Sequence, residues 1–248
     1  MIDLNGQVML VTGASSGIGK ALAGMCSEAG AKVALTARRP DRLKETADRC
    51  TGETLALPGD LVEEDHRKRL ADQCIQRWGR IDILINSAGM GMYGDFLSTT
   101  EALWRRLFEI NLFSTVFLTK EVLPHMQAQN QGLIVNMASI GGLIAHSNNV
   151  TPYVASKHAV VGFSRGLAED LKGTGIRVLA VCPHLTATEF FDVSPGAEEM
   201  APQVEKYKSF MDSPEAVARG VINQLDSERL VVFPTEKPAK AYDKQRDL

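Results

Sequence analysis

Short apolar segments alternate with longer amphipathic ones along almost the whole chain of 248 residues. Seven segments have the length and apolar content of buried strands: 7–11, 32–36, 54–57, 81–85, 132–137, 176–181 and 230–233. The longer segments between them carry apolar residues at spacings of three and four, which is typical of helices that cover a sheet. This alternation predicts βαβ units and a seven-stranded parallel sheet, an α/β fold.

Five helices are predicted, at 18–29, 63–78, 101–127, 153–172 and 214–225. No flexible linker or repeat divides them, so we expect a single domain over 1–248. Residues 184–212 break the rhythm with scattered aromatic residues, and a long insertion this late in an α/β domain favours a substrate lid. Residues 235–248 are polar, which favours a loose C-terminal tail.

The bulk composition is ordinary for a soluble globular protein, with 44% hydrophobic residues, 23% charged residues and a formal net charge of −3. It gives no reason to expect binding to nucleic acid or to a membrane. The first eleven residues lack the basic leader and apolar run of a signal peptide. The four cysteines form no CxxC pair and the histidines no HExxH, so we expect reduced thiols, no metal site and a cytoplasmic protein.

A glycine-rich turn, Thr12 to Gly19, follows the first predicted strand and leads into the first helix. Its spacing is GxxxGxG. Glycines permit positive φ and a close backbone approach, and a helix N-terminus offers free N–H groups to a phosphate. The turn therefore predicts a site for the pyrophosphate of a dinucleotide.

The same letters contain a second motif, because residues 13–17 read GASSG and fit the GxSxG nucleophile elbow of serine hydrolases. In that fold an upstream strand and loop supply the second oxyanion donor, but here the turn follows the very first strand, so no earlier strand and loop can supply it. The later histidines also have no evident acidic partner. The hydrolase alternative is therefore the weaker one.

In the order of its motifs the chain resembles the short-chain dehydrogenase/reductase family from about residue 7 to residue 188. The resemblance implies a three-layer, doubly wound Rossmann fold with strand order 3-2-1-4-5-6-7. It also implies a nicotinamide cofactor bound by the glycine turn, by two later loops and by the segment after the sixth strand. The implied cofactor residues are Gly13, Ser15, Ser16, Gly17, Ile18, Gly19, Asp60, Leu61, Asn86, Ser87, Ala88, Gly89, Tyr153, Lys157, Pro183, Thr186 and Thr188.

Four residues match the family's catalytic set: Asn111, Ser139, Tyr153 and Lys157. Tyr153 and Lys157 are four apart on a predicted helix, so their side chains share one face. The resemblance implies that Tyr153 exchanges a proton with a carbonyl or alcohol oxygen and that Lys157 holds the nicotinamide ribose. A neighbouring ammonium and an oxidised nicotinamide would lower the pKa of a tyrosine. Ser139 would bind the substrate oxygen, and Asn111 would place a water that relays protons.

The end of the second strand bears on the choice of cofactor. An acid there would accept hydrogen bonds from a ribose 2′-hydroxyl, but the sequence reads Thr36-Ala37-Arg38-Arg39. Arg38 and Arg39 would instead meet a 2′-phosphate with guanidinium groups. We therefore expect NADP(H) in preference to NAD(H).

Two positions depart from the family pattern: His184 stands where a glycine is common, and Ser87 replaces the second asparagine of NNAG. Apolar residues at 90, 92, 93, 96, 143 and 144, with the aromatic residues of the late segment, favour a hydrophobic ketone or alcohol as substrate. The family commonly forms dimers or tetramers, here through 103–123 and 160–171. A non-catalytic, NADPH-binding regulator of the same fold is the main alternative.

Overall fold

One parallel sheet organises the computed structural model, which describes residues 2–145 and 147–245. Its strands are β1 (Val8–Thr12), β2 (Lys32–Thr36), β3 (Thr54–Ala56), β4 (Ile83–Asn86), β5 (Gly132–Met137), β6 (Ile176–Val181) and β7 (Val231–Val232). They lie in the order β3-β2-β1-β4-β5-β6-β7, and each neighbouring pair is parallel. The order reverses between β1 and β4, which is where ligands bind in doubly wound sheets. The predicted α/β Rossmann fold is confirmed.

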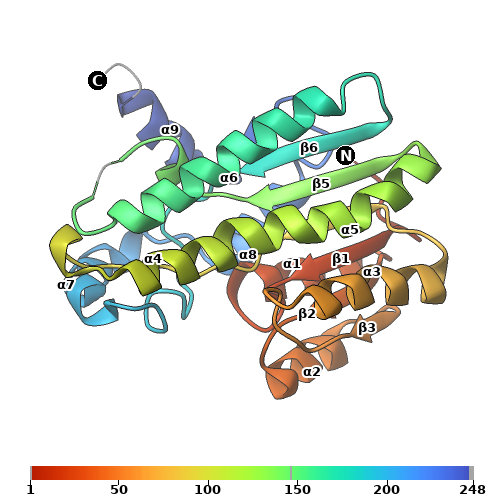
Figure 1. Ribbon diagram of the computed structural model, residues 1–248, viewed down its shortest axis with the longest axis horizontal. Coiled ribbons are helices and arrows are strands. Elements are labelled where there is room, and N and C mark those ends of the chain that lie inside the picture. The colour runs from red at the N-terminus through yellow and green to blue at the C-terminus, as the bar shows by residue number, and fades with distance from the viewer. Residues whose placement is uncertain (1, 146, 246–248) are drawn as a thin grey trace.

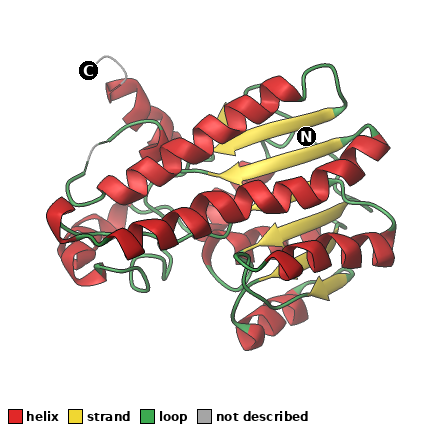
Figure 2. Ribbon diagram, in the orientation of Figure 1, coloured by secondary structure: helices red, strands yellow, loops and turns green. Residues whose placement is uncertain are grey.

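Helices cover both faces of the sheet (Figures 1 and 2). One face carries α1 (Gly17–Glu28), α2 (Pro40–Arg49) and α8 (Pro214–Ile222), and the other carries α3 (Glu64–Trp78), α5 (Ser114–Gln129) and α6 (Thr151–Asp170). Successive residues of β1 alternate between the two cores: Met9 and Val11 pack on the α1 side, and Leu10 packs on the α5 side. Burial on both faces explains why the strands read as continuous apolar runs.

The helix predicted over 101–127 is divided in the structure. It consists of α4 (Glu101–Phe108), a π-helical turn η2 (Glu109–Phe113) and α5, which follow one another as one rod in Figure 1. A π turn inserts an extra residue into the helix and is frequent at functional sites. Asn111 lies in this turn and is buried.

Three further helices were not predicted: α2, α7 (Ala197–Tyr207) and α9 (Glu236–Gln245). In α2 only Leu43 and Thr46 are buried, so its apolar pattern is too weak to read. The expected loose tail is wrong for residues 236–245. There α9 is held by the buried Pro238 and by the ring of Tyr242, 5.7 Å from that of Phe233. Residues 246–248 of the predicted tail lie outside the described residues.

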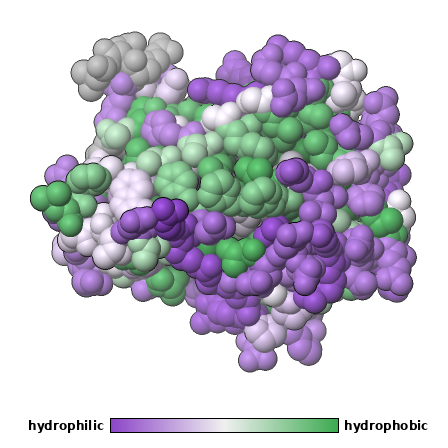
Figure 3. Space-filling view, viewed as in Figure 1, coloured by the Kyte–Doolittle hydropathy of each residue, from purple (hydrophilic) through white to green (hydrophobic). Residues whose placement is uncertain are grey.

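The face shown in Figure 3 carries a hydrophobic band over α5 and α6. Phe113, the last residue of η2, and Phe117 of α5 are 38% and 39% exposed, and their rings stack with centroids 6.0 Å apart. In the described part of the chain no helix combines the length and the apolar content that crossing a bilayer requires. Cys26, Cys50, Cys74 and Cys182 are all free.

Candidate active site

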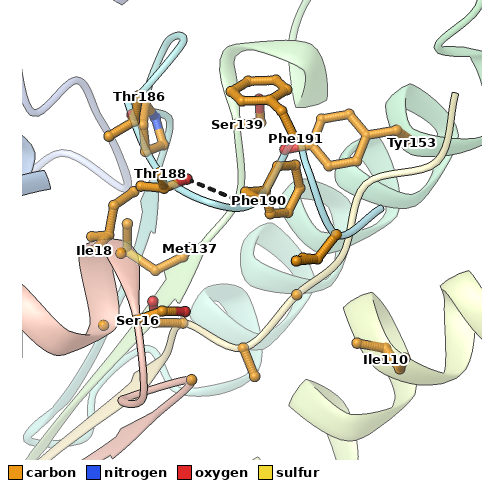
Figure 4. A pocket seen from close by; sticks show the side chains of 18 of the residues that line it. Ser16, Ile18, Ile110, Met137, Ser139, Tyr153, Thr186, Thr188, Phe190 and Phe191 are labelled. Atoms are coloured by element: carbon orange, nitrogen blue, oxygen red, sulfur yellow. Dashed lines mark hydrogen bonds between the residues drawn. The ribbon is translucent and has the colours of Figure 1, made fainter. Parts of the chain in front are cut away.

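A cavity of about 510 Å³ opens at the carboxyl ends of the strands, where the sheet order reverses. Every predicted site residue except Asn86 and Asn111 lines it. These residues are Gly13, Ser15, Ser16, Gly17, Ile18, Gly19, Arg38, Arg39, Asp60, Leu61, Ser87, Ala88, Gly89, Ser139, Tyr153, Lys157, Pro183, Thr186 and Thr188. Six of them are labelled in Figure 4: Ser16, Ile18, Ser139, Tyr153, Thr186 and Thr188. The sequence motifs therefore meet at one place in the fold.

The glycine turn between β1 and α1 forms one wall of the cavity. Gly13 and Gly17 have φ of +66° and +54°, a conformation that favours glycine. A Cβ on Gly19 would lie 2.5 Å from the carbonyl oxygen of Gly13, so the backbone closes on itself tightly. Ser16 caps α1 without a side-chain bond to the helix, so its first N–H groups stay open to a ligand. This open helix end and the small residues fit the pyrophosphate of a dinucleotide.

Ser15, the candidate nucleophile of the hydrolase alternative, faces a cation instead of a base. Its hydroxyl accepts a hydrogen bond from Arg39 Nη2 at 3.2 Å. A serine nucleophile needs a group that takes its proton, and a guanidinium does not. The structure therefore gives the hydrolase reading no support.

Asn86 lies behind the cavity and not in its lining. Its side-chain amide donates to Asn136 Oδ1 at 2.9 Å and to Thr119 Oγ1 at 3.3 Å. Asn136 in turn donates to Ser164 Oγ at 2.9 Å. These buried groups join β4 and β5 to α5 and α6, so Asn86 holds the scaffold of the site together and does not reach a ligand.

Asn111 also stands behind the wall. Its side chain accepts from Met90 N at 2.8 Å and donates to Met90 O and Ser156 Oγ, each at 3.0 Å. It thereby ties the loop after β4 to α6, the helix of Tyr153 and Lys157. A Cβ on Gly89 would lie 3.3 Å from Asn111 Oδ1 and 3.6 Å from Lys157 Nζ, so only glycine leaves this space open.

Tyr153, Lys157 and Ser139 stand together where the cavity meets α6. Lys157 Nζ lies 5.8 Å from the centre of the Tyr153 ring and donates to the carbonyl oxygen of Met137 at 2.9 Å. Ser139 Oγ accepts from Gly141 N at 3.1 Å, so its own hydrogen is free to be donated. Figure 4 shows the Tyr153 side chain pointing from α6 toward Ser139 and the phenylalanine pair of the late segment.

Burial dominates the electrostatics of this pair. It raises the pKa of Tyr153 to about 12, although the nearby Ser139 hydroxyl lowers it. Burial also lowers the pKa of Lys157 from 10.5 to about 8. Both shifts oppose the charged forms. The lowered tyrosine pKa expected from the sequence is thus not produced by the protein alone, because burial of Tyr153 itself is the largest effect on its pKa.

The opposite end of the cavity is polar. Arg39 follows β2, lines the cavity and donates to Ser16 Oγ at 3.0 Å as well as to Ser15. Arg38 also lines it and is exposed. Asp60 is fixed by an ion pair with Arg106 of α4 at 3.1 Å. An arginine cluster with serine hydroxyls beside the glycine turn is suited to a phosphate group.

His184 lines the cavity next to Pro183, and its φ is not positive. A histidine is tolerated here because the backbone does not need the left-handed conformation that favours glycine. Its imidazole adds to the wall where the family commonly has no side chain.

The end of the cavity near Tyr153 is apolar, with Tyr93, Val150, Val154, Phe190, Phe191 and Met200 in its wall. Of the apolar residues proposed from the sequence, Tyr93 lines the cavity, whereas Met92 is buried in the core and Phe96 is 59% exposed. Met90, Leu143 and Ile144 also lie outside its lining. Val150, Val154 and Glu189 were missed because nothing in their local sequence marks them.

A comparison with known families matches residues 7–198 to the short chain dehydrogenase model. This match covers well over half of the chain. The chain belongs to the short-chain dehydrogenase family. The resemblance drawn from the sequence is confirmed, and the seven-stranded sheet is the one it implied.

Individual relatives of this short-chain dehydrogenase agree. Human "Dehydrogenase/reductase SDR family member 7" is 40% identical over 189 residues, which cover 73% of this chain and 56% of that protein. An "Uncharacterized oxidoreductase" of Thermotoga maritima is 36% identical over 206 residues, covering 80% and 81% of the two chains. A Burkholderia phymatum short-chain dehydrogenase/reductase, solved in complex with NAD, superposes with a TM-score of 0.91 at 25% identity, covering 100% and 95%. That neighbour holds NAD, so a preference for NADP(H) stays a prediction.

We expect the buried Lys157 to lower the free energy of unfolding of this short-chain dehydrogenase at neutral pH. Its folded-state pKa of about 8 lies below the value of 10.5 expected when exposed, which corresponds to about 3 kcal/mol. A substitution of Lys157 would also lose its hydrogen bond to the Met137 carbonyl oxygen, which offsets about 1 kcal/mol of this gain in stability. We therefore expect Lys157→Met to raise the free energy of unfolding of the nucleotide-free protein at pH 7 by about 1–3 kcal/mol, measured by urea denaturation.

The pH dependence fixes the sign of this effect. Between pH 8 and 10.5 the unfolded chain binds more protons than the folded one, so the wild type gains stability as pH rises and the difference shrinks. Lys120→Met, on the exposed side of α5, is the control and should change stability by no more than about 0.5 kcal/mol. A Lys157→Met protein less stable than the wild type at pH 7 would contradict the argument.

Proposed function

We propose that this short-chain dehydrogenase is an NADP(H)-dependent oxidoreductase that interconverts a carbonyl compound and a secondary alcohol. The observation that carries the proposal is the position of Tyr153 and Ser139. Both line the same cavity as the glycine turn, and both present a hydroxyl to it. When bound, the nicotinamide supplies or accepts the hydride. The protein's part is to bind, orient and exchange a proton.

Tyr153 is the proton-exchanging group. Its pKa of about 12 makes it a neutral donor at pH 7, suited to give its proton to an oxygen that gains electrons. Ser139 holds that oxygen with its O–H, while its Oγ accepts from Gly141 N. In the reverse direction Tyr153 removes the alcohol proton, which a positive charge beside it would assist.

Lys157 and Asn111 support the exchange. One of the three Lys157 hydrogens is used by Met137 O, which leaves two for ribose hydroxyls. Both amide hydrogens of Asn111 are taken by protein atoms, so it would hold a relay water through an oxygen. Its main contribution to geometry is to fix the Gly89 loop beside Lys157.

Tyr153→Phe tests the proposal directly. We expect it to reduce NADPH consumption with carbonyl compounds by at least about 100-fold, because proton transfer contributes 10²–10⁴ in rate. NADPH binding, measured by fluorescence titration, should change little, since the phenyl ring keeps its contact with Phe190 at 5.7 Å.

The matched control is Tyr207→Phe, which removes a hydroxyl from an exposed tyrosine of α7 and should leave turnover unchanged. Undiminished turnover in Tyr153→Phe would remove this residue from the mechanism. A wild-type protein that binds NADPH tightly yet turns over no member of a panel of apolar and polar carbonyl compounds would favour the regulator alternative.

The substrate class follows from the wall beside Tyr153. Phe190 stands 5.7 Å from the Tyr153 ring and 5.7 Å from Phe191, which in turn stacks on Tyr93 at 6.2 Å. Such a surface gains free energy by covering apolar groups. We therefore propose a hydrophobic ketone or alcohol.

Cofactor preference rests on the end of β2. Ala37 supplies no carboxylate to a ribose 2′-hydroxyl, and Arg39 lies against both serines of the glycine turn. A charge-assisted bond to a phosphate is worth about 1.5–3 kcal/mol. NADP(H) is supported over NAD(H) on this ground, together with the absence of a repelling acid at position 37.

Arg39→Gln should weaken NADPH binding by about tenfold or more and leave NADH binding within about twofold, because only NADPH carries the 2′-phosphate. Fluorescence titration of both cofactors measures this. Arg49→Gln at the exposed end of α2 should alter neither affinity. Equal affinity of the wild type for NADPH and NADH would overturn the preference.

We also propose that copies of this chain associate through α5 and α6. The face over α5 and α6 carries a hydrophobic band (Figure 3), and the stacked rings of Phe113 and Phe117, at the start of α5, are partly exposed to solvent. Exposed patches of this kind mark interaction sites, and oligomers bury them by symmetry.

Replacing both Phe113 and Phe117 by serine should shift the sedimentation coefficient toward that of the 27.0 kDa monomer. Replacing Phe96 and Phe210, which are more exposed but lie away from α5, should not. A wild-type protein that sediments as a monomer at micromolar concentration would contradict the proposal.

The cytoplasm is the compartment that we propose. Four cysteines without a disulfide suit a reducing environment, because oxidising compartments favour paired thiols. Burial raises the pKa of Cys26, Cys74 and Cys182 to about 12, so these thiols stay protonated and unreactive.

A further inference from the structure

Glu189, in the segment 184–212, forms an ion pair with Arg39, the arginine that the proposed function assigns to the cofactor. It follows Thr188 and reaches across the mouth of the cavity to α2 and the residue before it. One carboxylate oxygen accepts from Arg39 Nη2 and the other from Arg42 Nη1. These two bonds lower the pKa of Glu189 to about 2, so it is an anion at neutral pH.

The Nη2 atom of Arg39 has more hydrogen-bond acceptors around it than hydrogens to donate. Its Nη2 carries two hydrogens, yet it lies within bonding distance of three acceptors: Ser15 Oγ, Ser16 Oγ and a Glu189 oxygen. A phosphate beside the two serines would approach this same nitrogen, at the position that the Glu189 oxygen occupies. The carboxylate and the phosphate are both anions, so they also repel each other if both stay.

Contacts of the residues on either side of Glu189 limit how far its side chain can move away from Arg39. A Cβ on Gly17 would lie 3.0 Å from Thr188 Cγ2, which shows how closely residue 188 approaches the glycine turn. Thr188 Oγ1 also accepts from Phe190 N at 3.3 Å, the bond drawn in Figure 4. The backbone is therefore held on both sides of Glu189, which keeps the Glu189 side chain close to Arg39. Phe190 then continues into the apolar wall beside Tyr153.

We propose that Glu189 is a built-in competitor for the 2′-phosphate at Arg39, which narrows the preference for NADP(H) over NAD(H). An NADP(H) molecule has to separate Glu189 from Arg39, whereas NAD(H), which lacks the 2′-phosphate, does not compete with Glu189 for this arginine. The same ion pair fastens the late segment over the cavity. The inference rests on the proposed assignment of Arg39 to the 2′-phosphate.

The test compares two fragments with the same number of phosphates, 2′,5′-ADP, which carries a 2′-phosphate, and the 5′-diphosphate ADP, which does not. Their binding to the wild type and to Glu189→Gln is measured by isothermal titration calorimetry. Removal of the competing carboxylate should tighten 2′,5′-ADP binding by about fivefold, the equivalent of a partly exposed ion pair near 1 kcal/mol. ADP binding should stay within about twofold. NADPH and NADH should follow the same pattern in fluorescence titrations.

Two controls separate a local competition from a general change of charge. Asp192→Asn removes one negative charge from an exposed position three residues further along the same segment and should change the ratio of the two affinities by less than twofold. In an Arg39→Gln background, Glu189→Gln should no longer tighten 2′,5′-ADP, because the contested group is gone. Thermal melts verify that each variant is folded.

Each other result overturns the proposal. Equal tightening of ADP and 2′,5′-ADP would mean that Glu189 acts only through overall charge. Weaker ADP or NADH binding in Glu189→Gln would mean that its carboxylate binds the ribose hydroxyls. No change would mean that the pair with Arg39 does not compete.

The outcome for the proposed cofactor is separate. A wild type that prefers NADH, combined with selective tightening of 2′,5′-ADP in Glu189→Gln, refutes the NADP(H) assignment and keeps the competition. A wild type that prefers NADPH, with no effect of Glu189→Gln, supports the NADP(H) assignment and refutes the competition by Glu189.

Discussion

The close approach of the glycine turn to the end of β4 is the constraint on which the site depends. A Cβ on Gly13 would lie 2.9 Å from both the N and the Cα of Ala88, so only a residue without a side chain lets the turn after β1 come this close to the loop after β4. Thr12 Oγ1 accepts from the backbone N of Ser87 and of Ala88, each at 2.9 Å, and fixes that distance. The cavity opens at this point because the connections from β1 and β4 leave to opposite faces of the sheet.

A second clamp relates this crevice to the chemistry on α6. Asn136 of β5 bonds to Asn86 of β4 and to Ser164 of α6, all of them buried. Nearer the start of the helix, a Cβ on Gly142 would lie 2.6 Å from the carbonyl oxygen of Lys157. Fully satisfied polar networks of this kind specify one arrangement of their elements. Tyr153 and Lys157 are thereby set at a fixed height above the strand ends.

Periodicity and motif order were sufficient to predict the sheet, the helices that face a core and most of the cavity wall. Each of those signals comes from a repeated physical demand, such as burial on both faces of a strand or φ above zero at Gly13. The exceptions are positions whose role depends on distant partners. The letters NSAG are adjacent, yet Asn86 turns into the core and Gly89 faces the cavity. Likewise α2 and α9 bury too few residues to show a period, and Glu189 meets Arg39 across 150 residues.

The two ends of the cavity place opposite demands on charge. Near Tyr153 burial disfavours both the phenolate and the lysine ammonium, so the protein provides a poorly solvated, apolar place in which an arriving positive charge has a large effect. At Arg39 the charges are half exposed and already paired, so an arriving anion has to exchange with one that is present. The chain between the two ends is continuous, since Glu189 and Phe190 are neighbours. The arginine end of the cavity and the apolar wall beside Tyr153 are therefore both formed by the same short segment, residues 188–191.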